Sequence, residues 1–394
     1  IVGITVTDPS GVIKHLTNAS GVMAITGATG LTDATQSNLA FYFGHTWQIS
    51  DALNIDWGVR WENMHATGDN SPAVTANYSD GGLDKDPNTV YDNVYGATPE
   101  TYHYDKTIST FSFSAGANYT FSDKFAIYAR VSEGNKAPDM DLYFNATSDF
   151  LIETLEPIAQ KVDQVELGAK MKGDKLSLFV TPFYSVLSNV PNVQNGTNLD
   201  QTQYSLPILY NKYTTIGVEL EADYKLATHF NIHGVLTLQK GKANDFNAWL
   251  LNTPGPDDDS LATFSGNETD NLARSIINIT PSYNTNKFYA QLTWAFMGKR
   301  QANVANAFLL PSFSQFNFGT GYNFSKNLQL SFVINNLFDT YGVMSWSRPG
   351  TFIQALDRQG FTKEMYEEAV KNNTPYSTIG IPARSYFLSL NLKF

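Results

Sequence analysis

The chain contains 394 residues, has no cysteine and carries a formal net charge of −11. The absence of cysteine excludes disulfides, thiolate metal sites and cysteine nucleophiles, and the acidic balance argues against nucleic acid as a partner. Charged residues make up only 16% of the chain while aromatic residues reach 13%, and no apolar run approaches the roughly 18 residues of a membrane-spanning helix.

A period of two residues dominates the chain. From residue 107 to residue 121 one parity is apolar and the other carries hydroxyl and amide side chains. The apolar parity comprises Phe111, Phe113, Ala115, Ala117, Tyr119 and Phe121. Similar alternation recurs in residues 124–132, 164–171, 215–224, 315–324 and 386–394. Because successive side chains of a strand point to opposite faces, these segments predict an all-β chain.

The connections between the predicted strands come in two alternating lengths. Short turns rich in Asp, Asn, Gly and Ser lie at residues 50–54, 122–124, 172–175, 226–229, 284–287 and 325–327. Long loops lie at about 67–106, 135–160, 189–211, 241–271, 299–311 and 339–378. Short turns at one end and long loops at the other are typical of an antiparallel transmembrane β-barrel.

Aromatic residues lie where the predicted strands meet turns or loops, as in the girdles at the two membrane interfaces. They are Trp47, Trp57, Trp61, Tyr119, Phe121, Tyr322, Phe324 and Phe394. The alternative is a soluble sandwich or solenoid whose core holds these rings. The barrel interpretation requires lipid on the side of Phe111, Phe113, Phe316 and Phe318, and water on the side of Thr110, Asn118 and Asn317.

The strand count is odd. Six hairpins supply twelve strands, residues 380–394 supply a thirteenth, and Ile1–Thr7 would supply a fourteenth if it is the end of a further strand. Bacterial single-chain barrels have even strand numbers. We therefore expect residues 1–34 to be an extracellular loop or an incomplete strand, and residues 35–394 to be the C-terminal portion of a larger barrel.

Three segments resemble the TonB-dependent outer-membrane receptors. The segment 128–139 is similar to the Ser-x-Gly-x-x-Ala-Pro run with which a strand leaves the membrane. Segment 333–341 resembles the Asn-Leu-Phe-Asp…Tyr motif of the family, and segment 381–394 resembles its closing strand. The matching residues are Arg130, Gly134, Ala137, Pro138, Asn336, Leu337, Phe338, Asp339, Tyr341, Arg384 and Phe394. The resemblance covers roughly residues 35–394.

The resemblance implies a 22-stranded barrel in the outer membrane of a Gram-negative bacterium, filled by an N-terminal plug that contacts the TonB complex. Neither plug nor TonB box is recognisable here, so about nine strands and the plug are expected to come from elsewhere. The partners implied are outer-membrane lipid, the TonB complex through the plug and a nutrient, with a surface lipoprotein or other outer-membrane chains as further candidates. The alternating tail ending in Phe394 resembles the family's signal for outer-membrane assembly.

No nucleophile elbow, zinc-protease motif or phosphate-binding loop occurs, so we expect no enzyme activity, cofactor or metal site. His229 and His233 share a strand face, about 13 Å apart at 3.3 Å per residue, which is too far for a local metal pair. The segment 84–88 imitates the start of a calcium loop but lacks the glycine and the glutamate that follow in such loops. The run 257–259 has the composition of a hydrated loop tip.

Charged side chains of the predicted polar face suggest pairing across the lumen. Arg130 and Lys124 lie on this face, where Glu166 or Glu219 would be their partners. The row Glu219, Glu221 and Asp223 faces the same side, and Lys170 or Arg130 would balance it.

The last long loop contains a predicted helix at residues 361–371, where Met365, Tyr366 and Ala369 form an apolar stripe. A long loop that forms its own helix is typical of a packed lid or a partner surface. We interpret this helix as a cap over the barrel mouth.

The leading functional hypothesis is an active-transport receptor whose extracellular loops capture a siderophore, glycan, cobalamin or peptide. The alternative is a passive porin-like or structural barrel within a larger assembly. Aromatic rings stack on flat ligands and an arginine binds anionic groups. The candidate substrate-binding residues are Tyr143, Phe144, Trp249, Trp346 and Arg348.

Overall fold

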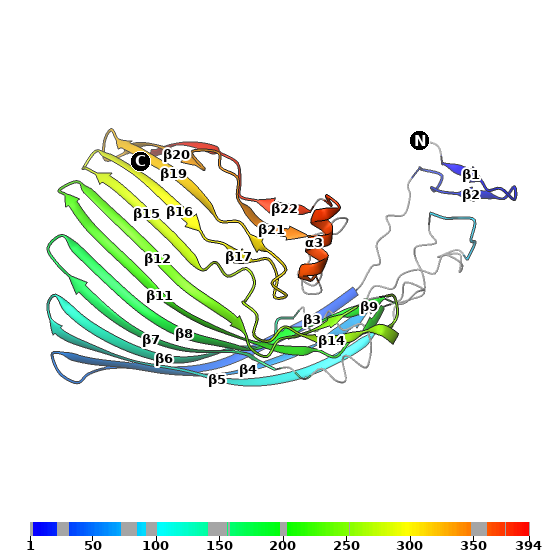
Figure 1. Cartoon of the computed structure of the whole chain (residues 1–394), viewed down its shortest axis with the longest axis horizontal. Helices are drawn as coiled ribbons and strands as arrows, with labels where there is room; N and C mark the ends of the chain where they lie inside the picture. The colour runs from blue at the N-terminus through cyan, green and yellow to red at the C-terminus, as the bar shows by residue number, and fades with distance from the viewer. Residues whose placement is uncertain are drawn as a thin grey trace.

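A computed structural model describes residues 3–21, 31–71, 85–91, 101–140, 156, 158–197, 203–251, 253–347, 361–374 and 376–393. Its main element is one antiparallel sheet of 13 strands, curved into an open trough (Figure 1). In chain order the strands are β3 (Leu31–Gln48), β4 (Leu53–Ser71), β5 (Tyr102–Ser122), β6 (Phe125–Lys136), β7 (Gln160–Lys172), β8 (Leu176–Asn192), β11 (Leu209–Ala227), β12 (Phe230–Ala243), β15 (Ser275–Asn284), β16 (Phe288–Met297), β19 (Phe313–Asn323), β20 (Leu328–Asn335) and β23 (Ser385–Leu392).

Each strand pairs with its neighbours in the chain, so the sheet is a continuous meander. The six tight turns join the strand pairs expected from the sequence, at one end of the trough, and the described parts of the long connections lie at the other end (Figure 1). The turns are closed by local hydrogen bonds; the backbone N–H groups of Ala52 and Leu53, for example, donate to Ser50 Oγ. The all-β prediction and the count of 13 strands are confirmed.

The two edges of the sheet are β3 and β23. Within the described residues no pairing joins them, so these strands form an open sheet. The possible fourteenth strand is not part of it: β1 (Thr5–Thr7) pairs with β2 (Ile13–His15) in a separate hairpin. That expectation was wrong because Thr5–Thr7 finds a partner only a few residues away in the chain.

The register between neighbouring strands places the polar residues of each alternating pattern on the same face of the sheet. Gly116 lies opposite Arg130, which lies opposite Glu166, and the row continues through Phe183 to Gly217. The opposite face carries Phe111 and Phe113, which are 53% and 40% exposed. The soluble-sandwich alternative required these phenylalanines to be enclosed in a core. Their exposure contradicts that alternative.

Aromatic rings on the polar face lie over glycines of the next strand. A Cβ added at Gly168 would clash with the Tyr128 ring, and one at Gly217 or Gly321 would clash with the ring of Phe183 or Tyr289. Such crowding is expected where side chains converge on the concave side of a curved sheet. Glycine is needed at these positions so that a ring can lie against the backbone.

Aromatic rings form two bands on the apolar face. Toward the long loops, the Phe41 and Trp61 rings stack with centroids 5.9 Å apart, and Phe111 lies opposite Trp61. Toward the short turns, Tyr119 and Phe121 contact at 4.7 Å. Ten residues separate Phe111 from Phe121, which is roughly 33 Å of strand and about 25 Å of membrane thickness at a tilt near 40°. This spacing matches the apolar band of an outer-membrane barrel.

Beyond the loop-side band the same face becomes polar. Asn63 donates to Ser109 Oγ at 2.8 Å, His65 contacts Asp105 at 2.8 Å and His103 contacts Asp69 at 2.9 Å. These residues belong to β4 and β5, which have 19 and 21 residues and so exceed the 9–11 residues needed to cross a bilayer. These strands are therefore about twice as long as a bilayer crossing requires, and their loop-side ends carry the polar residues.

Shorter elements occupy the long-loop end. The hairpins are β9 (Asn195–Thr197) with β10 (Gln203–Ser205), β13 (Asn247–Leu250) with β14 (Ser260–Thr263), β17 (Arg300–Gln301) with β18 (Leu309–Leu310) and β21 (Val343–Ser347) with β22 (Ser377–Gly380). The helical elements are η2 (Pro256–Asp258) and α3 (Lys363–Lys371). Among the described residues, no helix has the length and apolarity needed to cross a membrane.

Candidate functional site

Of the buried clusters at the long-loop end, two join loops that lie between β12 and β23 and are distant in the chain. The first, which we call the Phe246 cluster, consists of Ala243, Phe246, Ala248 and Val304, with Tyr213 and Phe264 packed against it. Phe246 is fully buried, and its ring lies 5.5 Å from that of Tyr213 on β11. The loop after β12 is thereby anchored to the sheet at β11.

Trp249 lies on β13 of this same loop. Its backbone N–H donates to Gln194 Oε1 at 2.8 Å, and Gln194 Nε2 donates back to the Trp249 carbonyl at 2.9 Å. The indole Nε1 donates to the Pro207 carbonyl at 3.1 Å. These three bonds fix the orientation of the half-buried indole and leave part of it accessible to a ligand.

The second cluster, which we call the Trp346 cluster, joins the loop after β16 to the loop after β20. It contains Ala302, Ala307, Leu310, Trp346 and Phe361, with Phe308, Val343, Tyr366 and Tyr376 around it. Trp346 is 1% exposed, and its Nε1 donates to the Ala302 carbonyl at 2.9 Å. A ring covered in this way packs the loops and does not offer a face to a ligand in this arrangement.

Helix α3 forms as the sequence predicts and lies beside β21 and β22 (Figure 1), where Tyr366 packs against this cluster. Thr362 caps its N-terminus by accepting from the Met365 N–H, and the Tyr366 ring stacks on Phe308 at 4.5 Å. Asn303, fully buried, donates to the Phe361 carbonyl at 2.6 Å. Tyr366 of the expected apolar stripe therefore packs inward, whereas Met365 stays 47% exposed.

Arg300, 2% exposed, connects the same two loops. Its Nη2 donates to the carbonyls of Val343 and Met344 at 2.7 and 2.9 Å, and its Nε donates to Asn271 Oδ1 at 3.1 Å. Burial lowers the pKa of the guanidinium. The oxygens that accept its hydrogen bonds are neutral. Nothing in the sequence around Arg300 distinguishes it, since its acceptors come from segments about 30 and 43 residues away.

The acidic run 257–259 is bonded within the loop end. Asp258 accepts from the Thr253 hydroxyl at 2.8 Å, and Asp259 accepts a short hydrogen bond from the Tyr204 hydroxyl. Burial and this contact raise the pKa of Tyr204 to about 12. In the segment resembling a calcium loop, Asp86 accepts from the backbone and side-chain amides of Asn88 at 2.9 Å, which closes a turn.

The residues of the C-terminal motif meet where β20 ends. Asn336 is fully buried at φ 50°, receives the Thr340 N–H on Oδ1 at 2.9 Å and donates to the carbonyls of Thr340 and Pro382. Asp339 Oδ1 accepts from the Arg384 N–H at 2.9 Å, and Tyr341 contacts Thr378. The motif thus fastens the last loop to the closing strand.

The other members of the motif contact β19. The Leu337 N–H donates to the Phe316 carbonyl, and Phe338 packs edge-on against Phe316.

The first motif ends β6. The strand stops at Lys136, directly before Ala137 and the buried Pro138, which cannot donate to a ladder. Gly134 lies opposite Val162, and a Cβ there would approach Val162 Cγ1 to 3.2 Å.

On the polar face, Arg130 and Glu166 face each other in register and line a cavity of about 280 Å³ with Asp56 and Lys170. The expected role of Lys124 on this face was wrong, because Lys124 pairs with Asp174 at the neighbouring turn, 3.5 Å away. Lys170 lies 4.9 Å from the Tyr128 ring centre. Asp223 pairs with His233 at 2.8 Å instead of the expected lysine or arginine.

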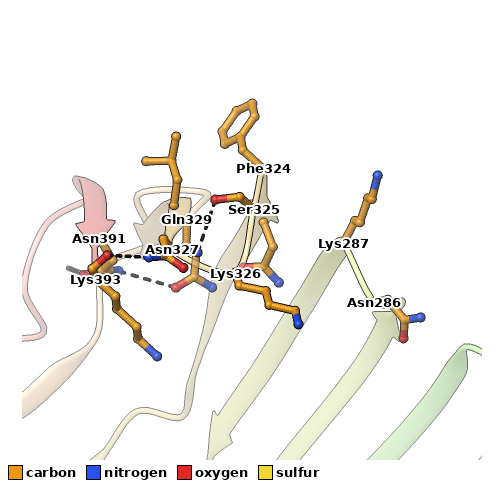
Figure 2. Close-up of a pocket in the computed structure, with 11 residues that line it drawn as sticks. Asn286, Lys287, Phe324, Ser325, Lys326, Asn327, Gln329, Asn391 and Lys393 are labelled. Atoms are coloured by element: carbon orange, nitrogen blue, oxygen red, sulfur yellow. Dashed lines mark hydrogen bonds between the residues drawn. The ribbon is translucent and has the colours of Figure 1, made fainter.

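A larger cavity of about 550 Å³ lies at the short-turn end (Figure 2). Three lysines, Lys287, Lys326 and Lys393, line it and concentrate positive charge there. Asn327 Nδ2 donates to the Lys393 carbonyl and the Lys393 N–H donates to the Asn327 carbonyl, both at 2.9 Å. These reciprocal bonds attach the end of the closing strand to the turn between β19 and β20.

Comparison with known proteins identifies the family. The family model described as TonB dependent receptor-like, beta-barrel matches residues 8–337. This chain belongs to the TonB-dependent receptor family. Its members are transport receptors and not enzymes, in agreement with the prediction from the sequence.

Among individual relatives, the pesticin receptor of Yersinia pestis is 23% identical over 335 residues, which is 82% of this chain and 43% of the relative. The rhizobactin receptor of Rhizobium meliloti (strain 1021) is 22% identical over 344 residues, covering 81% of this chain and 40% of the relative. The chain thus spans less than half the length of these curated relatives.

Solved structures share the fold. The ferric yersiniabactin uptake receptor FyuA from Yersinia pestis superimposes with a TM-score of 0.62 at 16% identity, over 93% of this chain and 47% of that one. The siderophore receptor PiuA from Acinetobacter baumannii gives a TM-score of 0.61 at 15% identity, over 92% of this chain and 44% of that one.

The structure brings two of the five candidate substrate-binding residues into view. Trp249 lies on β13, in the loop that carries Phe246, and is partly accessible. Trp346 lies in the Trp346 cluster and is buried. Tyr143, Phe144 and Arg348 lie outside the described residues, as does Phe394, and their roles stay predictions. Sequence analysis missed Arg300 and Phe308, which hold the loops together.

Proposed function

We propose that this chain forms the C-terminal part of the barrel of an outer-membrane receptor that captures a scarce nutrient at its loop end and imports it with TonB-derived energy. The edges β3 and β23 would pair with further strands, and a plug domain would contact TonB. Unpaired strand edges favour such completion, because their backbone groups need partners in a membrane.

The observation that carries the proposal is the organised loop end. A passive pore gains little from loops that bury their own aromatic clusters, whereas a receptor needs loops held in one geometry before its ligand arrives. Two clusters, the buried Arg300 and helix α3 provide this rigidity.

A ferric siderophore is the substrate class we propose, because relatives of this chain include the rhizobactin receptor and the fold is shared with a ferric yersiniabactin uptake receptor. Trp249 would contact the ligand, with Tyr143, Phe144 and Arg348 as further contacts. Trp346 would act indirectly, by keeping the loops packed.

Uptake of iron-55 siderophores by cells that produce the receptor tests this proposal. We expect TonB-dependent uptake that falls at least about tenfold with Trp249→Ala, since an aromatic anchor contributes on the order of 1.4 kcal/mol or more. Val370→Ala on the exposed side of α3 serves as the control. Uptake that survives loss of TonB, together with solute leakage in liposome swelling, would instead identify a passive channel.

A further inference from the structure

Three potential metal ligands meet on the polar face of the sheet, near the short turn between β11 and β12. Glu221 and Asp223 belong to β11 and His233 belongs to β12. One potential ligand atom from each lies within 4.8 Å of the other two. Among the described residues, this is the one such group of three or more His, Cys, Asp or Glu side chains.

The fold explains why these residues meet. Asp223 lies directly opposite His233 in the antiparallel ladder, and Glu221 is two residues earlier, so all three point to one face. Their positions are set by two hydrogen-bonded strands and not by a mobile loop. A metal site built on strands needs only side-chain rotation to close around an ion.

The donors are accessible and already oriented. The side chains of His233 and Asp223 are 44% and 56% exposed, so an ion can reach them from the lumen. Asp223 Oδ1 lies 2.8 Å from His233 Nδ1, so a carboxylate oxygen and an imidazole nitrogen are already adjacent on this face. Glu221 has no polar residue opposite it in register, because Val235 and Phe179 occupy those positions.

The local charge favours a cation. Glu219 precedes the group on the same face, so three carboxylates follow one another at alternate positions of β11. Lys225 is the cation of this strand on that face, and the polar residues opposite Asp223 and His233 from the outer neighbouring strands are Ser177 and Thr280, both uncharged. Like charges on one face repel, and a bound cation relieves that repulsion.

We propose that Glu221, Asp223 and His233 form a binding site for a divalent transition-metal ion on the lumenal wall of the barrel. One imidazole nitrogen with carboxylate oxygens suits Zn²⁺, Cu²⁺ or Ni²⁺ better than Ca²⁺ or Mg²⁺, which prefer oxygen ligands alone. Three protein ligands leave a coordination position open for water or for a ligand passing through the lumen. The site is separate from the loop end and does not depend on the transport proposal.

The test is metal binding by the complete receptor that contains this chain, purified in detergent micelles. In calorimetric titration with Zn²⁺ we expect one site whose affinity falls at least about 100-fold in His233→Ala, since loss of an outer partner of a ligand alone costs 10–100-fold. With Cu²⁺, electron paramagnetic resonance should show coupling to a single imidazole nitrogen, and His233→Ala should remove that signal.

His65→Ala is the matched control, because His65 Nε2 also lies 2.8 Å from an aspartate, Asp105, but His65 belongs to no described group with a second carboxylate within the same reach. It should bind Zn²⁺ like the wild type. Glu221→Gln preserves side-chain shape and replaces His233→Ala if the latter does not fold, as judged by circular dichroism. Wild-type affinity in His233→Ala or Glu221→Gln, or an equal loss in His65→Ala, would overturn the proposal; the transport hypothesis would be unaffected.

Discussion

The wall of the sheet and its loop end are stabilised in different ways. In the wall, neighbours in space are neighbours in the chain, and each strand carries one apolar and one polar face. At the loop end, Trp346 packs on Phe308 and Arg300 binds the carbonyl of Val343, contacts that span about 40 residues. We therefore expect the wall to depend on surrounding lipid, whereas the loop end depends on small protein cores of its own.

The largest effect should come from breaking the Trp346 cluster. Trp346→Ala removes a ring that is 1% exposed and should destabilise the packed loops by about 3–5 kcal/mol, as for buried aromatic residues elsewhere. Hydrogen exchange should rise in residues 301–310 and in α3 while the wall strands stay protected. Val370→Ala, at a position 55% exposed, should change neither region. Uniform loss of protection in the wall would show that the two regions are not separate.

The two faces of the wall can be compared at adjacent positions of β5. Ala117 lies on the apolar face and Asn118 on the polar face, between the two aromatic bands. Ala117→Arg should destabilise the folded protein in lipid by about 2–4 kcal/mol, because the charge would face hydrocarbon. Asn118→Arg should cost much less. Urea titration in liposomes measures both, and equal costs would contradict the assigned faces.

Asn336 links the wall to the last loop. Asn336→Ala removes hydrogen bonds to Thr340 and Pro382 from a fully buried position and should cost about 2–3 kcal/mol. The neighbouring half-buried Asn335, whose one side-chain contact is a 3.4 Å bond to Ser385, provides the comparison. Asn335→Ala should cost less than about 1 kcal/mol. A similar cost for both in thermal unfolding would remove the structural role assigned to the motif.

The smallest effect concerns pH. Hydrogen bonds from Arg274 lower the pKa of Glu268 below 4.5, and Gln301 Nε2 also donates to this carboxylate at 3.1 Å. A lowered pKa means that the stabilisation is present above about pH 4.5 and is lost as pH falls through the folded-state value. The loop end should therefore loosen as the pH falls below about 4.5 and through the folded-state pKa of Glu268, with a small effect because Arg274 is 57% exposed. Tryptophan fluorescence should follow this change, and Glu268→Gln should abolish it.

Much of the wall could be predicted from the sequence because its information is local. Alternation at residues 107–121 assigns faces, and the Asp, Asn and Ser residues of the turns assign hairpins, so β5 and its neighbours follow directly. The helix at 361–371 was equally predictable, since Thr362 and the apolar stripe are adjacent in the chain.

The loop contacts and the metal-ligand group could not be predicted in this way. Trp346 looks like an exposed loop aromatic in the sequence, and only the fold of residues 301–310 around it shows that it is buried. Along the chain, His229 is the nearest histidine to His233, but it lies in the turn before β12, and the partners of His233 are across the ladder at Asp223 and Glu221. Register between strands decides that pairing, and a period of two does not reveal register.

Site-directed spin labelling tests the central claim, that lipid covers the apolar face, most directly. The chain has no cysteine, so single cysteines can be placed at each position from 111 to 121 without background labelling. In liposomes, labels at odd positions should collide with oxygen dissolved in lipid, and labels at even positions with a water-soluble nickel chelate. Reversed parity, or no alternation between adjacent positions, would contradict the account.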